Sequence, residues 1–238
     1  MTIAYILLII CAAFMLMRWD EYKKGITVEN SVLRDETDKQ LAEISADAIY
    51  KKFGLFEENA KWNGAVFRYS TISDVSFNKV SEASLPAEDL WVGNIIDRET
   101  RIEKFRNEVF KAFVNEGDTG TKNHSSVYLP IARELKRLSE SKSDIRRLFI
   151  YSDLMENRPD LRFYKEETFR MLTEHPEYIL KKFEEWQPLP SLSGIEVHFI
   201  YQPADVTADR YFRTVSEFYG RMLEAKGAKV VIEANLQN

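Results

Sequence analysis

Two short apolar runs bounded by charges constrain the fold more than any other feature of the sequence. They are RRLFIYSD at 146–153 and IEVHFIY at 195–201, and both carry large apolar residues at consecutive positions. Because successive side chains of a strand point to opposite faces, a continuous apolar run requires cover on both faces, as in a parallel sheet. The sequence therefore predicts a sheet that lies between two layers of helices.

The rest of the chain alternates between helical and extended patterns. Apolar residues recur every three or four positions in four predicted helical regions: 98–115, 127–138, 160–186 (interrupted at His175-Pro176) and 211–222. Further strands are predicted at 65–74, 79–87 and 229–233, the second of them at an edge because it ends near Pro86. This alternation indicates an α/β fold, with an open, mostly parallel twisted sheet and helices on both faces.

Three parts are predicted along the 238 residues: a transmembrane anchor at 1–18, a linker and lead-in helix at 19–60, and the α/β domain at 61–238. The linker mixes charges with few large apolar side chains, and its helix is expected near 44–56. All the alternating patterns lie beyond this segment. A chain that begins near residue 45 is therefore expected to fold on its own.

The anchor is predicted from an uncharged run at residues 2–17, which Trp19 and the basic residues Arg18, Lys23 and Lys24 follow. As a helix this run is about 25 Å long, near the lower limit for crossing a bilayer once. The basic flank favours the cytoplasmic side for the domain. A cleaved secretory signal is the alternative, although no basic residue precedes the apolar run.

Charge and cysteine content exclude several functions. The net charge is −5, from 38 acidic and 33 basic residues spread along the chain, so no basic face is available for nucleic acid. Cys11 is the single cysteine and lies inside the apolar run. An internal disulfide, a structural zinc site and thiol redox catalysis are therefore not expected.

Oxygen-bearing side chains follow the predicted strands where ligands bind in open parallel sheets. Asp74, Ser76 and Asn78 follow the strand at 65–74, which is taken as the first strand of the sheet. Ser126, or Ser125, precedes the helix at 127–138 and is also the expected helix cap. Asp153 follows the strand at 146–153. Oxygen ligands of this kind suit Mg²⁺ or Mn²⁺.

These motifs, in this order, resemble the metal-ion-dependent adhesion site of von Willebrand factor type A (vWA) domains, over roughly residues 62–236. The matching metal ligands would be Asp74, Ser76, Asn78, Ser126 (or Ser125) and Asp153. The motif is degenerate, because Asn78 replaces a hydroxyl residue and Leu154 stands where the family often has glycine. The resemblance implies a non-enzymatic module for protein interaction or assembly, whose bound cation completes its coordination with a carboxylate of the protein partner.

Two other functions stay open at this stage. In one, the same aspartates hold a catalytic metal in a hydrolase or phosphotransferase, although no glycine-rich phosphate loop is present. In the other, the domain is a metal-free scaffold. His124, His175 and His198 are interpreted as structural, because no two of them share a face.

Overall fold

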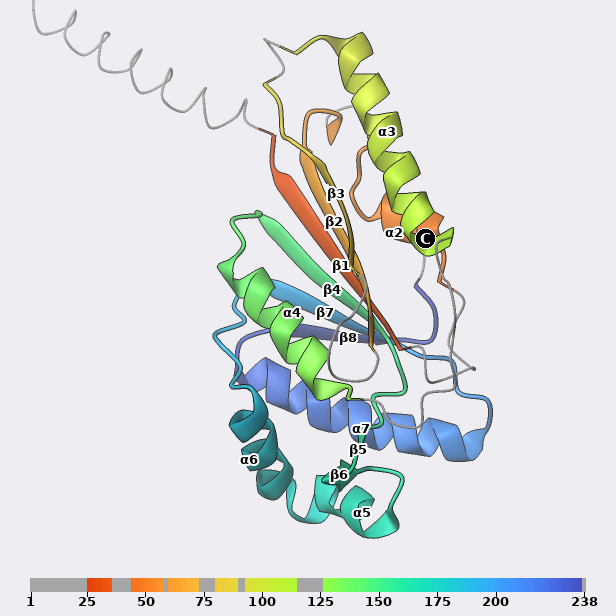
Figure 1. Ribbon diagram of the computed structural model, residues 1–238, viewed down its shortest axis with the longest axis vertical. Helices are drawn as coiled ribbons and strands as arrows, with labels where there is room; N and C mark the ends of the chain where they lie inside the picture. The colour runs from red at the N-terminus through yellow and green to blue at the C-terminus, as the bar shows by residue number, and fades with distance from the viewer. Residues whose placement is uncertain are drawn as a thin grey trace, which may run out of the picture.

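The computed structural model describes residues 25–35, 44–57, 60–72, 80–89, 93–114 and 126–236. One six-stranded sheet runs through this part of the chain in the order β3-β2-β1-β4-β7-β8 (Figure 1). Its strands are β1 (Thr27–Asp35), β2 (Gly64–Ile72), β3 (Val80–Leu85), β4 (Ile145–Tyr151), β7 (Ile195–Ile200) and β8 (Lys229–Glu233). All neighbouring pairs are parallel except β2 and β3, so β3 is an antiparallel edge strand, as predicted.

Helices connect the parallel strands and cover both faces of the sheet. They are α2 (Ala46–Lys51), α3 (Ile95–Val114), α4 (Tyr128–Glu140), α5 (Glu166–Glu174), α6 (Pro176–Trp186) and α7 (Val206–Ala225). The predicted break between α5 and α6 is confirmed at His175. A short antiparallel hairpin follows β4 and was not expected from the sequence. Its strands are β5 (Asn157–Arg158) and β6 (Leu161–Arg162), each two residues long.

Two hydrophobic cores result, one on each face of the sheet. On the first face, Leu33, Leu148 and Phe199 pack against α4, α5, α6 and α7. On the second face, Val32, Phe149 and neighbouring residues pack against α2 and α3. Figure 1 shows α4 and α7 on the side of the sheet opposite to α2 and α3. The predicted α/β fold with helices on both faces is therefore confirmed.

The predicted linker at 19–60 is wrong over 27–35, because this segment forms β1 near the centre of the sheet. β1 pairs along its whole length with β2 and, over 28–34, with β4, and seven of its nine residues are buried. The lead-in helix is confirmed as α2. The sheet therefore begins at Thr27 rather than after residue 60, and the strand taken as the first is the second.

A buried arginine fastens the loops at the amino-terminal end of β2. Arg98 of α3 has no exposed surface and donates hydrogen bonds to the backbone carbonyls of Lys61, Asn63 and Pro86. Glu88 lies 3.1 Å from the same guanidinium and balances its charge. The first turn of α3 is thus tied to the segment before β2 and the segment after β3. Both segments lie at the end of the sheet opposite to the carboxyl ends of the parallel strands.

Among the residues that the structure describes, no helix is both long and apolar enough to cross a bilayer. The predicted anchor at 1–18 lies outside the described residues.

Candidate functional site at the switch point of the sheet

The strand order changes direction between β1 and β4. From β1 the chain continues through α2 to β2, whereas from β4 it continues through α5 and α6 to β7, which lies on the other side. The two connections also lie on opposite faces of the sheet. Such a topological switch point leaves a crevice beyond the carboxyl ends of the two strands, where ligands bind in folds of this type.

Asp35 ends β1 and lies directly beside the end of β4. Arg34 pairs with Tyr151, so the next residues of the two strands, Asp35 and Ser152, are level with each other. The Ser152 hydroxyl donates to Oδ2 of Asp35 at 2.9 Å and also accepts from the backbone N–H of Leu154. Both side chains are buried. The carboxylate is thus held at the switch point by its neighbouring strand.

Asp153 is the next residue after Ser152, and both of its carboxylate oxygens accept hydrogen bonds. Oδ1 accepts from the backbone N–H of Met155 at 2.9 Å, and Oδ2 accepts from the Tyr164 hydroxyl at 3.0 Å. Leu154 follows with φ of 62°, which is the left-handed region that costs a non-glycine residue about 1 to 2 kcal/mol. Full burial of the Leu154 side chain holds this strained turn in place.

Ser126 lies just before α4, but it does not cap the helix as predicted. The N-cap residue is Val127, which makes no side-chain cap bond. Instead, Oε2 of Glu156 accepts the N–H groups of Val127 and Tyr128 at 3.0 and 2.8 Å. A carboxylate 28 residues further along the chain therefore caps α4. This contact places Ser126 beside Glu156, in the segment that follows β4.

Glu156 is fully buried, and burial raises its pKa from 4.5 to about 7, although the two N–H donors oppose this shift. Its second oxygen, Oε1, has no hydrogen-bond partner within the described ranges. The buried Tyr219 hydroxyl also has no hydrogen-bond partner there, whereas the Ser126 hydroxyl interacts with the Glu156 carboxyl group and lowers its pKa. Unpaired polar atoms are costly in a protein interior, so Glu156 and Tyr219 are the buried polar groups of this region that the fold leaves least compensated.

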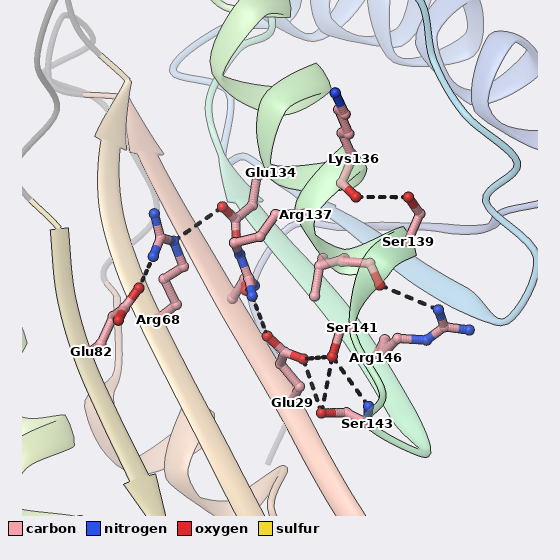
Figure 2. Close-up of polar contacts among 12 residues, drawn as sticks. Glu29, Arg68, Glu82, Glu134, Lys136, Arg137, Ser139, Ser141, Ser143 and Arg146 are labelled. Carbon is pink, nitrogen blue, oxygen red and sulfur yellow. Dashed lines mark hydrogen bonds and ion pairs between the residues drawn. The ribbon is translucent and has the colours of Figure 1, made fainter.

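A polar network fixes the other end of α4 on the sheet (Figure 2). Arg137 of α4 donates to Oε1 of Glu29 in β1 at 2.6 Å and also binds Glu134. Ser141 and Ser143, which follow the helix, donate to the other oxygen of Glu29. Burial alone would raise the pKa of Glu29, but these hydrogen bonds together hold it below its ordinary value. The buried carboxylate is therefore compensated and ionised.

The network continues from α4 across two further strands. Arg68 of β2 lies 3.2 Å from Glu134 and forms an ion pair with Glu82 of β3 (Figure 2). Charged side chains thus join α4 to three strands of the sheet. Because α4 is fixed at both ends, by Glu156 and by Glu29, the position of Ser126 at its start is defined by the fold.

Of the predicted ligands, Asp153 lies two residues after β4, and Ser126 lies at the start of α4 beside Glu156. Asp74, Ser76 and Asn78 lie outside the described residues. The two strands that precede Asp74 and Asp153 are not neighbours in the sheet, because β1 lies between β2 and β4. Sequence reasoning missed Asp35, the carboxylate that lies beside β4.

The donors at the switch point are chemically suited to a hard divalent cation. Asp35, Asp153 and the buried Ser126 hydroxyl carry oxygen atoms only, which is the ligand type that Mg²⁺ prefers. No three His, Cys, Asp or Glu side chains gather as a metal site in the described ranges. A cation here would therefore depend on hydroxyl groups, water and a partner's oxygen as well as on the two carboxylates.

The strand order and the antiparallel edge strand β3 define an open, mostly parallel α/β fold, which is the fold that the resemblance to vWA domains implies. No protein family and no curated protein matches the sequence. Among solved structures, the chain is similar to an aerotolerance-related membrane protein from Bacteroides fragilis carrying multiple mutations to serine. The identity is 10%, the TM-score is 0.40, and the match covers 89% of this chain and 92% of that one.

Two further structures show similarity at the same identity of 10%. One is proximal thread matrix protein 1 from the mussel byssus, with a TM-score of 0.40 and coverage of 90% of this chain and 45% of that one. The other is the VWA domain of SpRpn10, with a TM-score of 0.37 and coverage of 88% and 90%. These similarities concern the fold alone.

Proposed function

We propose that the protein is a membrane-anchored vWA-like module for protein interaction or assembly, and that a divalent cation at the switch point contributes to binding. The observation that carries this proposal is the pair of aspartates, Asp35 and Asp153, at the ends of the two strands that flank the switch point. The buried Ser126 hydroxyl at the start of α4, beside Glu156, is the third oxygen considered. A carboxylate of a protein partner would complete the coordination of the cation.

The cation is expected to raise the melting temperature of the protein, because only the folded chain brings the ligands together. At a Mg²⁺ concentration one hundredfold above its Kd, the gain in stability is about 2.7 kcal/mol, or a few degrees for a domain of this size. Asp35→Asn and Asp153→Asn should each lose most of this gain. In metal-free buffer both variants should melt no lower than the wild type. At position 35 an amide oxygen can still accept from the Ser152 hydroxyl. At position 153 the amide oxygen can accept from the Met155 N–H while the NH₂ group donates to the Tyr164 hydroxyl oxygen.

Two further variants make this experiment specific. Asp74→Asn shows whether the carboxylate predicted from the sequence contributes, and it should lose the cation response only if residues 73–79 reach the switch point. Asp97→Asn on the exposed face of α3 is the matched control and should respond as the wild type does. Absence of any response to millimolar Mg²⁺ or Mn²⁺ in the wild type would leave a metal-free scaffold as the function.

Residues 1–18 are proposed to anchor the protein in a membrane, on the strength of their uncharged run and its aromatic and basic flank. After alkaline carbonate extraction, the full-length chain is expected to stay with the membrane pellet. A chain that lacks residues 1–18 should move to the supernatant. Release of the unprocessed full-length chain would contradict the anchor.

A further inference from the structure

Three exposed isoleucines lie at the end of the domain where β1 begins. Ile26 precedes β1, and Ile95 and Ile96 start α3, with exposed fractions of 42%, 44% and 73%. Figure 1 shows the start of β1 and the start of α3 at the same end of the molecule. Single exposed apolar residues are ordinary, whereas several at one place indicate a surface that meets a partner.

Hydrogen bonds and close packing hold this end together. The side chain of Asn63 accepts the N–H of Ile26 at 3.1 Å, and its carbonyl accepts from Arg98 in the first turn of α3. Gly93, just before α3, lies against the Trp62 ring, where an added Cβ would come within 2.0 Å of a ring carbon. The point where the chain enters the domain and the start of α3 therefore form one packed unit.

Charged side chains beside the isoleucines pair with one another. Lys61 lies 3.3 Å from Glu99. Arg101 lies 2.7 Å from Glu88 and 2.8 Å from Asp97. Apolar side chains, rather than a charge of one sign, are therefore the feature of this end that a partner would recognise.

The predicted anchor brings a lipid bilayer to the same end. Residues 19–24 separate the anchor from Gly25, and a fully extended chain spans at most about 3.6 Å per residue. The bilayer surface is thus within about 25 Å of Gly25, which is less than the length of α3, about 30 Å for its 20 residues. Apolar side chains gain free energy on leaving water for the boundary between headgroups and acyl chains.

We propose that Ile26, Ile95 and Ile96 dock on the bilayer that holds the anchor. The amino-terminal end of the sheet then faces lipid, and the carboxyl ends of the parallel strands face away from the membrane, toward a protein partner. This inference rests on the proposed membrane anchor and is independent of the cation.

Spin labels on the full-length chain in phosphatidylcholine vesicles test the proposal. Cys11→Ala leaves an introduced cysteine as the one attachment point, at Ile95→Cys or, as the matched control, at Val114→Cys in the last turn of α3, where the exposed fraction is 81%. The label at position 95 should collide mainly with O₂, which concentrates in the bilayer, and the label at position 114 with a water-soluble nickel complex. Adding phosphatidylserine should change neither result, because the neighbouring charges are paired.

A second substitution tests the isoleucines themselves. Ile96→Asn should shift the label at position 95 toward water, with the ratio of docked to free domain falling at least about tenfold, as expected for one apolar side chain that leaves lipid. Val114→Asn should leave this label unchanged. Both variants should still float with the vesicles in a density gradient, since the anchor is intact.

The possible outcomes separate the two proposals. A chain that floats with position 95 in water would overturn the docking and leave the anchor in place, and so would an unchanged label in Ile96→Asn. A label at position 95 that neither reagent reaches would indicate contact with a second copy of the chain instead of lipid. Position 114 in lipid would contradict the orientation, and failure to float would overturn the anchor and the docking together.

Discussion

A chain that begins at residue 45 is expected to show no cooperative unfolding transition, because it lacks β1. This strand joins β2 and β3 to β4, β7 and β8, and the two halves of the sheet have no other strand between them. Burial of Val28, Val32 and Leu33 alone contributes about 5 to 9 kcal/mol, which is comparable to the whole stability of a typical domain. The sequence-based expectation that this shorter chain folds independently is therefore replaced by the opposite prediction.

Circular dichroism during heating measures this directly. A chain that begins at residue 25 is the matched control and should melt in a single cooperative step, since it keeps every strand of the sheet. If the chain from residue 45 melts close to the temperature of the control, β1 is dispensable for folding. The domain would then begin after β1, as the sequence predicts.

Glu156→Gln is expected to stabilise the protein by about 3 kcal/mol at pH 8 and to have almost no effect near pH 4. In the folded chain burial raises the pKa of Glu156 to about 7, whereas in the unfolded chain its value is close to 4.5. Between these values the folded state holds a proton that the unfolded state has released, so the stability of the wild type falls as pH rises. This loss of stability continues until the pH exceeds the folded pKa of about 7. A neutral amide at position 156 does not ionise and so avoids the loss.

The amide can also keep the contacts of the carboxyl group. Its oxygen can accept the N–H groups of Val127 and Tyr128, and its NH₂ can donate to the nearby hydroxyl oxygens of Ser126 and Tyr219. Urea unfolding at a series of pH values provides the measurement. Glu185→Gln on the exposed face of α6 is the control and should follow the wild type. A difference between Glu156→Gln and the wild type that does not change with pH would contradict the raised pKa.

Most of the fold follows from the sequence because most elements carry a local pattern. The apolar runs of β4 and β7 and the periodic helices were recognisable without any knowledge of distant contacts. β1 was not, because Glu29 and Asn30 lie in the middle of TVENSVLRD and interrupt its apolar residues. The structure satisfies Glu29 through Arg137, which lies 108 residues away, and no local pattern reveals such a partner.

The candidate site could be predicted only on its β4 side for the same reason. Asp153 follows a strand with a clear apolar run, so it was assigned to the site. Asp35 ends β1, whose sequence resembles a polar linker. The first carboxylate of the site was therefore assigned to Asp74, after β2. One signal was available, since Val32 and Leu33 precede Asp35 and a hydroxyl residue, Thr37, comes two positions after it. Glu156 gave no signal, because its capping role depends on a helix that begins 28 residues earlier.

The central position of β1 also affects how the protein is made. Asp35 and Ser152 are 117 residues apart, so at synthesis rates of roughly 5 to 20 residues per second β1 waits roughly 6 to 23 s for its partner β4. During this time one edge of β1 has no neighbour within the growing chain, and unpaired edges invite pairing with other chains. Glu29 and Asn30 place a charge and an amide in the middle of this edge strand. By the general rule that charged residues discourage edge-to-edge pairing, we expect the residues that obscure β1 in the sequence also to disfavour its pairing with other chains until β4 is synthesised.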